Sequence, residues 1–240
     1  FVPNSDSVGL FPGLSDDEAL FCTNYCLISR SMVEVAGWLY KEEKHPRMKW
    51  VKKALCCPNN GQDVYFADYD YRNEESSIPQ IWYLKTPHFS LLENAEGLPL
   101  RTVAVFNTED KKKSFSVKPE SLGLPKGKYR FTDAWTQETF DVSSSLKISI
   151  GAHASRLFAV SKAKGMQMLD ANIKVNSIEA DGKSLKIDLA HKGELEILLC
   201  GQAKKIMYNG KLLKFKQEKK GKCYFITART SENGAMEITF

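Results

Sequence analysis

The fold of this chain is decided by residues 101–140, RTVAVFNTEDKKKSFSVKPESLGLPKGKYRFTDAWTQETF, and by residues 146–160, LKISIGAHASRLFAV. Short runs that are rich in β-branched and aromatic residues alternate here with breaks of Asn, Asp, Gly, Pro and Ser. This pattern is typical of short strands joined by tight turns. Several such strands at close spacing predict an antiparallel β-sandwich.

The same period of two extends from residue 61 to residue 162, which we interpret as the full sandwich. The strands expected within it are 64–67, 78–84, 102–106, 114–117, 128–132, 146–150 and 154–160.

A second small all-β module is predicted for residues 163–240. Alternating segments such as SLKIDLA (184–190) and GELEILLC (193–200) are separated by turn residues. Asp181-Gly182 and Asn209-Gly210 are strong signals for two-residue hairpins.

The first 60 residues have a different, helical period. Residues 15–30 predict a helix in which Ser15 is the N-cap and Glu18 completes a capping box. Residues 31–36 are compatible with a strand. Pro46 is expected to open a second helix, whose apolar side would include Met48, Val51, Leu55 and, less clearly placed, Trp50. A helix, a strand and a helix in residues 1–60 indicate a piece of α/β architecture.

Several short motifs occur in a fixed order between residues 14 and 160. They are LSDDEALFCTNYCLISRSMVEVAGWL (14–39), HPRMKWVKKAL (45–55), IPQIWYL (78–84), RTVAVFNTED (101–110), SLGLPKGKYRFTDAWTQE (121–138) and IGAHASRLFAV (150–160). In this order they resemble the end of the catalytic barrel and the trailing sandwich of α-galactosidase (melibiase) glycoside hydrolases. The resemblance implies a mainly β chain: a short α/β segment from the end of a (β/α)₈ barrel, an antiparallel β-sandwich, and the additional all-β module.

The resemblance also implies a function. Members of this family are retaining hydrolases of terminal α-linked sugars, and their two aspartates come from middle barrel strands, which would precede Phe1. We therefore assign no catalytic residue. The chain is expected to be a C-terminal, non-catalytic region of an enzyme for galactose-type sugars, which shields or stabilises the barrel of the same parent chain and is inactive alone.

Two other functions stay open. One is a carbohydrate-binding β-sandwich protein without hydrolase activity, and the other is a structural β-module that sets contacts between copies of the chain in a homo-oligomer.

Trp38 is the first candidate for sugar contact. In the resemblance it follows the last barrel strand, and active sites of such barrels lie at the C-terminal strand ends. At the end of this strand many relatives have a triplet that consists of a small residue, an Asp and a Leu. The corresponding triplet in this chain is Gly37-Trp38-Leu39. The lost carboxylate leaves substrate contacts in question, and a Trp packed beneath the sandwich is an equal alternative.

A second candidate is a loop in which tyrosines alternate with carboxylates. Tyr65, Asp68, Tyr69, Asp70 and Tyr71 could stack on and hydrogen-bond to a sugar. The alternative, which we favour, is a solvated loop beside a strand.

Six cysteines are present, at positions 22, 26, 56, 57, 200 and 223. None forms a Cys-x-x-Cys motif and no nearby His completes a zinc set, so neither a metal nor a cofactor is predicted. Buried free thiols in a reducing compartment are favoured, which points to the cytoplasm. Cys200 and Cys223 lie on predicted strands that could bring them face to face.

The composition, 42% hydrophobic and 26% charged residues in 240, is ordinary for a globular protein. No run approaches the roughly 18 apolar residues that cross a bilayer, and the first residues do not read as a signal peptide. The net charge of +5 comes from lysines scattered in turns such as 109–113 and 216–222. Such lysines solvate loops and protect sheet edges, so carbohydrate and the barrel are the expected partners, and nucleic acid and membrane are not.

Overall fold

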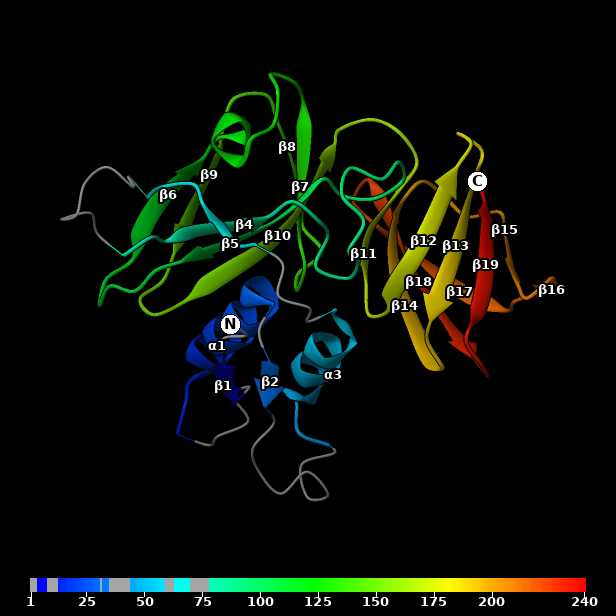
Figure 1. Ribbon diagram of the computed structural model, residues 1–240, viewed down its shortest axis with the longest axis horizontal. Helices are drawn as coiled ribbons and strands as arrows, with labels where there is room; N and C mark the ends of the chain where they lie inside the picture. The colour runs from blue at the N-terminus through cyan, green and yellow to red at the C-terminus, as the bar shows by residue number, and fades with distance from the viewer. Residues whose placement is uncertain (1–3, 8–12, 31, 35–43, 59–62, 70–77) are drawn as a thin grey trace.

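The computed structural model describes residues 4–7, 13–30, 32–34, 44–58, 63–69 and 78–240 (Figure 1). Within these ranges the chain is mainly β, with two α-helices, as the sequence predicts. Two β-rich parts lie next to each other, and both helices lie against the first of them. None of the described helices is long and apolar enough to cross a membrane.

The first β-rich part is an antiparallel sandwich. Its larger sheet has the order β3 (Tyr65–Phe66), β4 (Ile81–Leu84), β5 (Arg101–Phe106), β10 (Ser155–Lys162), β7 (Tyr129–Asp133) and β8 (Thr139–Val142). The smaller sheet pairs β6 (Lys113–Val117) with β9 (Leu146–Ile150), and the short helix η1 (Pro119–Leu122) follows β6. Phe115 and Ile148 of the small sheet share one core with Val103 and Phe158 of the large sheet.

Strand β5 explains why the sequence shows an unbroken apolar run there. Val103 and Val105 belong to the core between the two sheets, whereas Ala104 and Phe106 belong to a second core on the opposite face. Successive side chains of a strand point to opposite faces, and both faces of β5 are buried. Hydrophobic residues are therefore required at consecutive positions.

The opposite face of the large sheet is covered by the helices α1 (Asp16–Ser29) and α3 (Met48–Cys56). Leu27 and Ile28 of α1 and Ala54 of α3 pack against Leu84 and Leu157 of the sheet. The helical segment is thereby joined to the sandwich through a buried apolar contact.

Helix α1 begins as predicted. The hydroxyl of Ser15 accepts a hydrogen bond from the Glu18 N–H at 3.2 Å, and the Glu18 carboxylate accepts one from the Ser15 N–H at 2.9 Å. Two strands, β1 (Asn4–Ser7) and β2 (Met32–Glu34), flank α1 in the chain and pair in parallel. This β-α-β unit is a building block of α/β folds, while the barrel origin of residues 1–60 stays a prediction.

Helix α3 differs in detail from its prediction. It begins at Met48, so Pro46 lies ahead of the helix and not in its first turn. Val51 and Ala54 are buried, but Leu55 is 58% exposed, and the prediction of an apolar role for Leu55 is wrong. The side of the helix that is buried includes Lys53 in place of Leu55. Lys53 can be buried because its ammonium group pairs with the carboxylate of Asp170 inside the protein.

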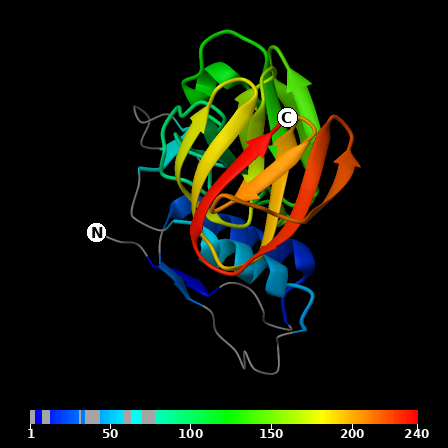
Figure 2. The same ribbon diagram turned by 90° about the vertical axis from the view of Figure 1, so that its right-hand side faces the viewer.

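The second β-rich part packs two sheets face to face (Figure 2). One sheet has the order β11 (Gln167–Ala171), β14 (Gly193–Cys200), β18 (Cys223–Thr230) and β17 (Phe215–Lys220). The other has the order β12 (Lys174–Ala180), β13 (Ser184–Ala190), β19 (Gly234–Thr239), β15 (Lys205–Tyr208) and β16 (Lys211–Leu212). We call this part, residues 166–240, the second module.

The prediction of a two-residue hairpin at Asn209-Gly210 is confirmed. Asn209 and Gly210 join β15 to β16 and both have positive φ, 48° and 74°. This is the type I′ turn that Asn-Gly favours. A hairpin also joins β12 to β13, as predicted, but the Asp181 N–H donates to the Ser184 carbonyl at 3.2 Å, so the two residues of the turn are Gly182 and Lys183 and not Asp181 and Gly182.

One segment of the sandwich reaches into the second module. Between β4 and β5 the chain carries Phe89 and Leu98 into the module's core. The Val175 N–H donates to the Phe89 carbonyl and the Met168 N–H to the Gly97 carbonyl, both at 2.9 Å. The second module is therefore built on residues from two separate stretches of the chain.

Candidate functional site

A cleft of about 1120 Å³ lies between α3, the turn 134–137 and the outer face of the sheet that contains β14. Trp50 and Trp135 line it from the helix and the turn, respectively. Their rings meet edge to face at 67°, with centroids 6.4 Å apart. Carboxylates, an arginine and a histidine line the opposite side, so aromatic and polar side chains converge on one hollow.

One face of strand β14 lines this cleft, because its side chains point alternately into the core and into the cleft. Leu195 and Ile197 point into the core of the second module, whereas Glu194 and Glu196 line the cleft. In the strand register Glu194 lies opposite Arg229 of β18, which also lines the cleft. Side chains at alternate positions share one face of a strand, and this face presents opposite charges side by side.

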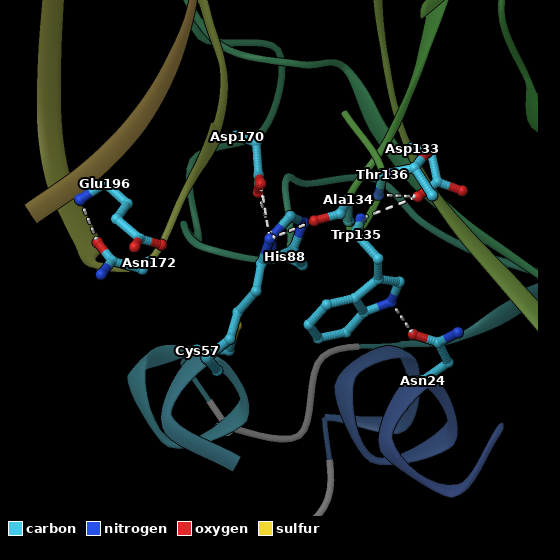
Figure 3. A network of polar contacts seen from close by, with 11 residues as sticks. Asn24, Cys57, His88, Asp133, Ala134, Trp135, Thr136, Asp170, Asn172 and Glu196 are labelled. Atoms are coloured by element: carbon cyan, nitrogen blue, oxygen red, sulfur yellow. Dashed lines mark hydrogen bonds and ion pairs between the residues drawn. The ribbon is translucent and has the colours of Figure 1, made fainter. Parts of the chain in front are cut away.

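The turn that carries Trp135 is fixed by its neighbours (Figure 3). Asp133 accepts hydrogen bonds from the N–H groups of Trp135 at 2.9 Å and Thr136 at 2.8 Å. The indole N–H of Trp135 donates to the Asn24 side chain of α1 at 2.7 Å. The indole is thus held in one orientation at the edge of the cleft.

A buried charged cluster lies beside the cleft, and two of its members, Lys53 and Asp170, line it. Lys53 Nζ lies 2.6 Å from one carboxylate oxygen of Asp170, and His88 Nε2 lies 2.9 Å from the other. Lys53 also donates to the Ala134 carbonyl at 2.8 Å, and its Nζ lies 5.0 Å from the Trp135 ring centre. Figure 3 shows Asp170 and His88 meeting above α3. We call Lys53, His88 and Asp170 the buried triad.

The environment sets the charge of each partner. Burial raises the pKa of Asp170, but the nearby Lys53 and His88 outweigh it and bring this pKa below its usual value. Burial is the largest effect on His88 and lowers its pKa, Lys53 and Arg30 lower it further, and together they outweigh the opposing effect of Asp170. The triad therefore contains an ion pair between Lys53 and Asp170, and the imidazole beside it is shifted toward its neutral form.

The imidazole of His88 is poorly satisfied. Its contact with Asp170 is short but not well aligned for a hydrogen bond, and within the described residues its Nδ1 has no partner. Asp170 is nevertheless engaged by Lys53 at 2.6 Å, which favours a structural role for this carboxylate over a catalytic one.

The predicted tyrosine and aspartate loop lies elsewhere, at the β3 edge of the sandwich. Tyr65 stacks on Tyr83 with ring centroids 5.3 Å apart, and Lys85 Nζ lies 4.3 Å from its centre. Both carboxylate oxygens of Asp68 accept backbone N–H groups at the start of β4, each at 2.9 Å. Asp68 therefore holds the loop to the strand.

Tyr69 contacts the Phe66 ring with centroids 6.2 Å apart. Trp38, Asp70 and Tyr71 lie outside the described residues. None of the described loop residues lines the cleft, and the role of this loop in sugar contact stays a prediction.

The sequence did not single out the cleft. The helical pattern predicts Trp50 only for the apolar side of α3, and no motif connects Lys53, His88 and Asp170. The signal that could have found Trp50 is a large aromatic residue between lysines on a helix. In the part of the chain that the structure describes, no three His, Cys, Asp or Glu residues are placed to hold a metal ion.

The described residues of 65–69 and 78–162 form an antiparallel β-sandwich with helices on one face. Residues 96–160 match the family model of the α-galactosidase C-terminal β-sandwich domain. The resemblance noted from the motifs is thereby confirmed for this segment. No curated protein matches the chain in sequence.

Solved structures share the fold. A GH27 β-L-arabinopyranosidase from Geobacillus stearothermophilus is 21% identical, with a TM-score of 0.52 over 68% of this chain and 38% of its own. A Bacillus halodurans protein that carries the provisional name α-N-acetylgalactosaminidase is 17% identical, with a TM-score of 0.51 over the same shares. The matched region thus spans less than half of either protein.

Proposed function

We propose that this chain is the C-terminal region of a glycoside hydrolase that acts on terminal α-linked galactose-type sugars. The observation that carries the proposal is the match of residues 96–160 to the α-galactosidase C-terminal sandwich. The parallel β-α-β unit ahead of the sandwich is compatible with the end of a catalytic barrel. The apolar contact of α1 and α3 with the large sheet would attach the sandwich to that barrel and stabilise it.

We further propose that the chain alone does not hydrolyse glycosides. A retaining mechanism needs two carboxyl groups roughly 5–5.5 Å apart on either side of the scissile bond. Asp170, the buried carboxylate at the cleft, is neutralised by Lys53. A carboxylate held in this way is a weak nucleophile and has no proton to donate.

The test has two parts. Incubated with p-nitrophenyl α-D-galactopyranoside, the chain is expected to release no more p-nitrophenol than a boiled sample. Sequencing the gene upstream of the Phe1 codon is expected to reveal barrel strands that end in two aspartates. Turnover by the chain itself would contradict the non-catalytic role, and an upstream region without such strands would contradict the assignment to a hydrolase.

The cleft supports a second candidate function, carbohydrate binding without hydrolysis. Aromatic faces next to carboxylates and an arginine suit a sugar ring, because one face of the ring is apolar and its hydroxyl groups hydrogen-bond. Trp50 and Trp135 would supply the stacking surface, and Glu194, Glu196 and Arg229 the polar contacts.

Replacing Trp50 with alanine is expected to weaken binding of melibiose by about tenfold, because a stacked aromatic ring contributes roughly 1.4 kcal/mol. Isothermal titration calorimetry of the whole chain measures this change. Leu212→Ala is the control, because Leu212 is a large exposed residue outside the cleft. If the unmodified chain binds no sugar at millimolar concentration, the binding function is contradicted.

A further inference from the structure

Two cysteines of the second module lie opposite each other on neighbouring strands. Cys200 ends β14 and Cys223 begins β18. The register pairs Leu199 with Tyr224, so the next pair along the strands is Cys200 and Cys223. Residues directly opposite in antiparallel strands have Cα atoms about 4.5–5.5 Å apart, a separation that a disulfide can bridge. Both residues are free thiols in the structure.

An arginine of the sandwich reaches this pair. Arg130 of β7 is almost fully buried, and its Nη1 lies 2.7 Å from Cys200 Sγ. The same guanidinium binds the Asp141 carboxylate of β8 at 2.7 and 3.2 Å. Lys222, next to Cys223 in the chain, binds Asp141 at 2.8 Å. The two thiols therefore lie where the sandwich and the second module meet.

The surroundings make the two sulfurs unequal. A hydrogen bond from the Cys223 thiol lowers the pKa of Cys200 to about 6, with help from Arg130 and against the effects of burial and Asp141. The same hydrogen bond, together with burial, raises the pKa of Cys223. Cys223 is fully buried, whereas Cys200 is partly exposed. One accessible thiolate beside one protected thiol is the arrangement that attacks disulfides.

We propose that Cys200 and Cys223 are a redox-active thiol pair, which low-molecular-weight disulfides of the glutathione type convert to a cross-strand disulfide. The Cys200 thiolate attacks one sulfur of the small disulfide, forms a mixed disulfide and releases one small thiolate. The Cys223 thiol then loses its proton, attacks Cys200 Sγ and displaces the second half, which leaves as a thiol. The protein pair is oxidised by two electrons, and one small disulfide is reduced to one thiolate, which takes a proton from water, and one thiol.

Oxidation changes the contact between the two β-rich parts. The thiolate that faces Arg130 is replaced by a neutral sulfur, so Arg130 retains only the Asp141 carboxylate as an anionic partner among these groups. The redox state of the pair is thereby coupled to the junction of sandwich and second module.

Treating the intact chain with oxidised glutathione and mapping its peptides by mass spectrometry tests the proposal. A peptide that links Cys200 to Cys223, lighter than the two thiol peptides by two hydrogen atoms, is the expected product. In a Cys223→Ser variant, Cys200 is expected to stop at the mixed disulfide, because the second attacking group is absent. If Cys200 and Cys223 stay unlinked while glutathione accumulates on other cysteines, the proposal is wrong.

A second measurement needs no variant. The rate at which iodoacetamide alkylates Cys200 is expected to reach half of its maximum near pH 6. Burial raises the pKa of Cys22 in the same chain, so Cys22 serves as an internal comparison with a higher midpoint. Cys223→Ala, which removes the hydrogen-bond donor, is expected to shift the Cys200 midpoint upward. A Cys200 midpoint at the ordinary thiol value, about 8.5, would overturn the proposal.

Discussion

Replacing Asp170 with asparagine is expected to lower the free energy of unfolding by about 3–5 kcal/mol, as removing one partner of a buried ion pair usually does. Asp170 is buried, and its carboxylate faces Lys53 on one side and His88 on the other. Asparagine keeps the size of the side chain but removes its charge. The Lys53 ammonium would then be buried without an anion, and urea denaturation followed by circular dichroism measures the loss.

The matched control is Asp110→Asn. The Asp110 side chain is 93% exposed and pairs with His153 at 2.8 Å, so its loss should change stability by at most about 1 kcal/mol. A cycle with Lys53→Met isolates the pair: the double variant is expected to lose less than the sum of the two single variants. Equal losses for Asp170→Asn and the control would show that the triad does not stabilise the fold.

Much of the sandwich could be predicted, because the residues that favour a strand locally are also the residues that its two faces require in the folded sheet. In β9, Leu146, Ile148 and Ile150 are buried and the residues between them are exposed, which gives an unmistakable period of two. The polar residues at the ends of strands also make the strand boundaries predictable. Asn107 is fully buried, and its side-chain amide donates to the carbonyls of Lys111, Ile150 and Gly151. A buried amide at a strand end needs such partners.

Other elements left no local signal. Strand β1 has the sequence Asn-Ser-Asp-Ser, which has low strand propensity, and it is identified by its pairing with β2. Strand β8 alternates only partly between half-buried and exposed positions, because it lies at the edge of its sheet. These strands form because a neighbouring strand supplies backbone hydrogen bonds, and not because their own side chains alternate between two faces. Their sequence pattern is therefore weak.

The candidate site illustrates the same limit more strongly. The Asp133 turn was predictable, because carboxylates commonly accept N–H groups two and three residues ahead. The buried triad was not, because Lys53 and Asp170 are 117 residues apart and meet only when α3, the sandwich and the second module come together. From the sequence alone a lysine on a short helix is expected to be solvated.

The largest effect on the second module is expected from Phe89→Ala, which should lower the free energy of unfolding by about 3–5 kcal/mol. Phe89 belongs to the loop between β4 and β5, yet it is fully buried in the core of the second module. The adjacent Ser90 hydroxyl donates to the Val175 carbonyl at 3.0 Å, so the backbone is held there and cannot collapse into the vacated volume. A cavity that cannot close is costly, because the burial of the apolar ring is lost and the residues that line the cavity lose packing contacts.

The strands that become less protected distinguish a local loss of packing in the second module from a general loss of stability. Hydrogen exchange measured by mass spectrometry is expected to accelerate first in β12 and β13, which contribute Val175 and Ile187 to the same core, and to stay slow in β5 and β10. Ile78→Ala, at a side chain that is 71% exposed, should change stability by less than about 0.5 kcal/mol. If Phe89→Ala loosens β5 as readily as β13, or costs no more than the control, the loop is a dispensable connection. If exchange in the variant is fast in β13 and stays slow in β5, Phe89 belongs to the second module. A core residue is part of the cooperative unit whose unfolding its removal promotes.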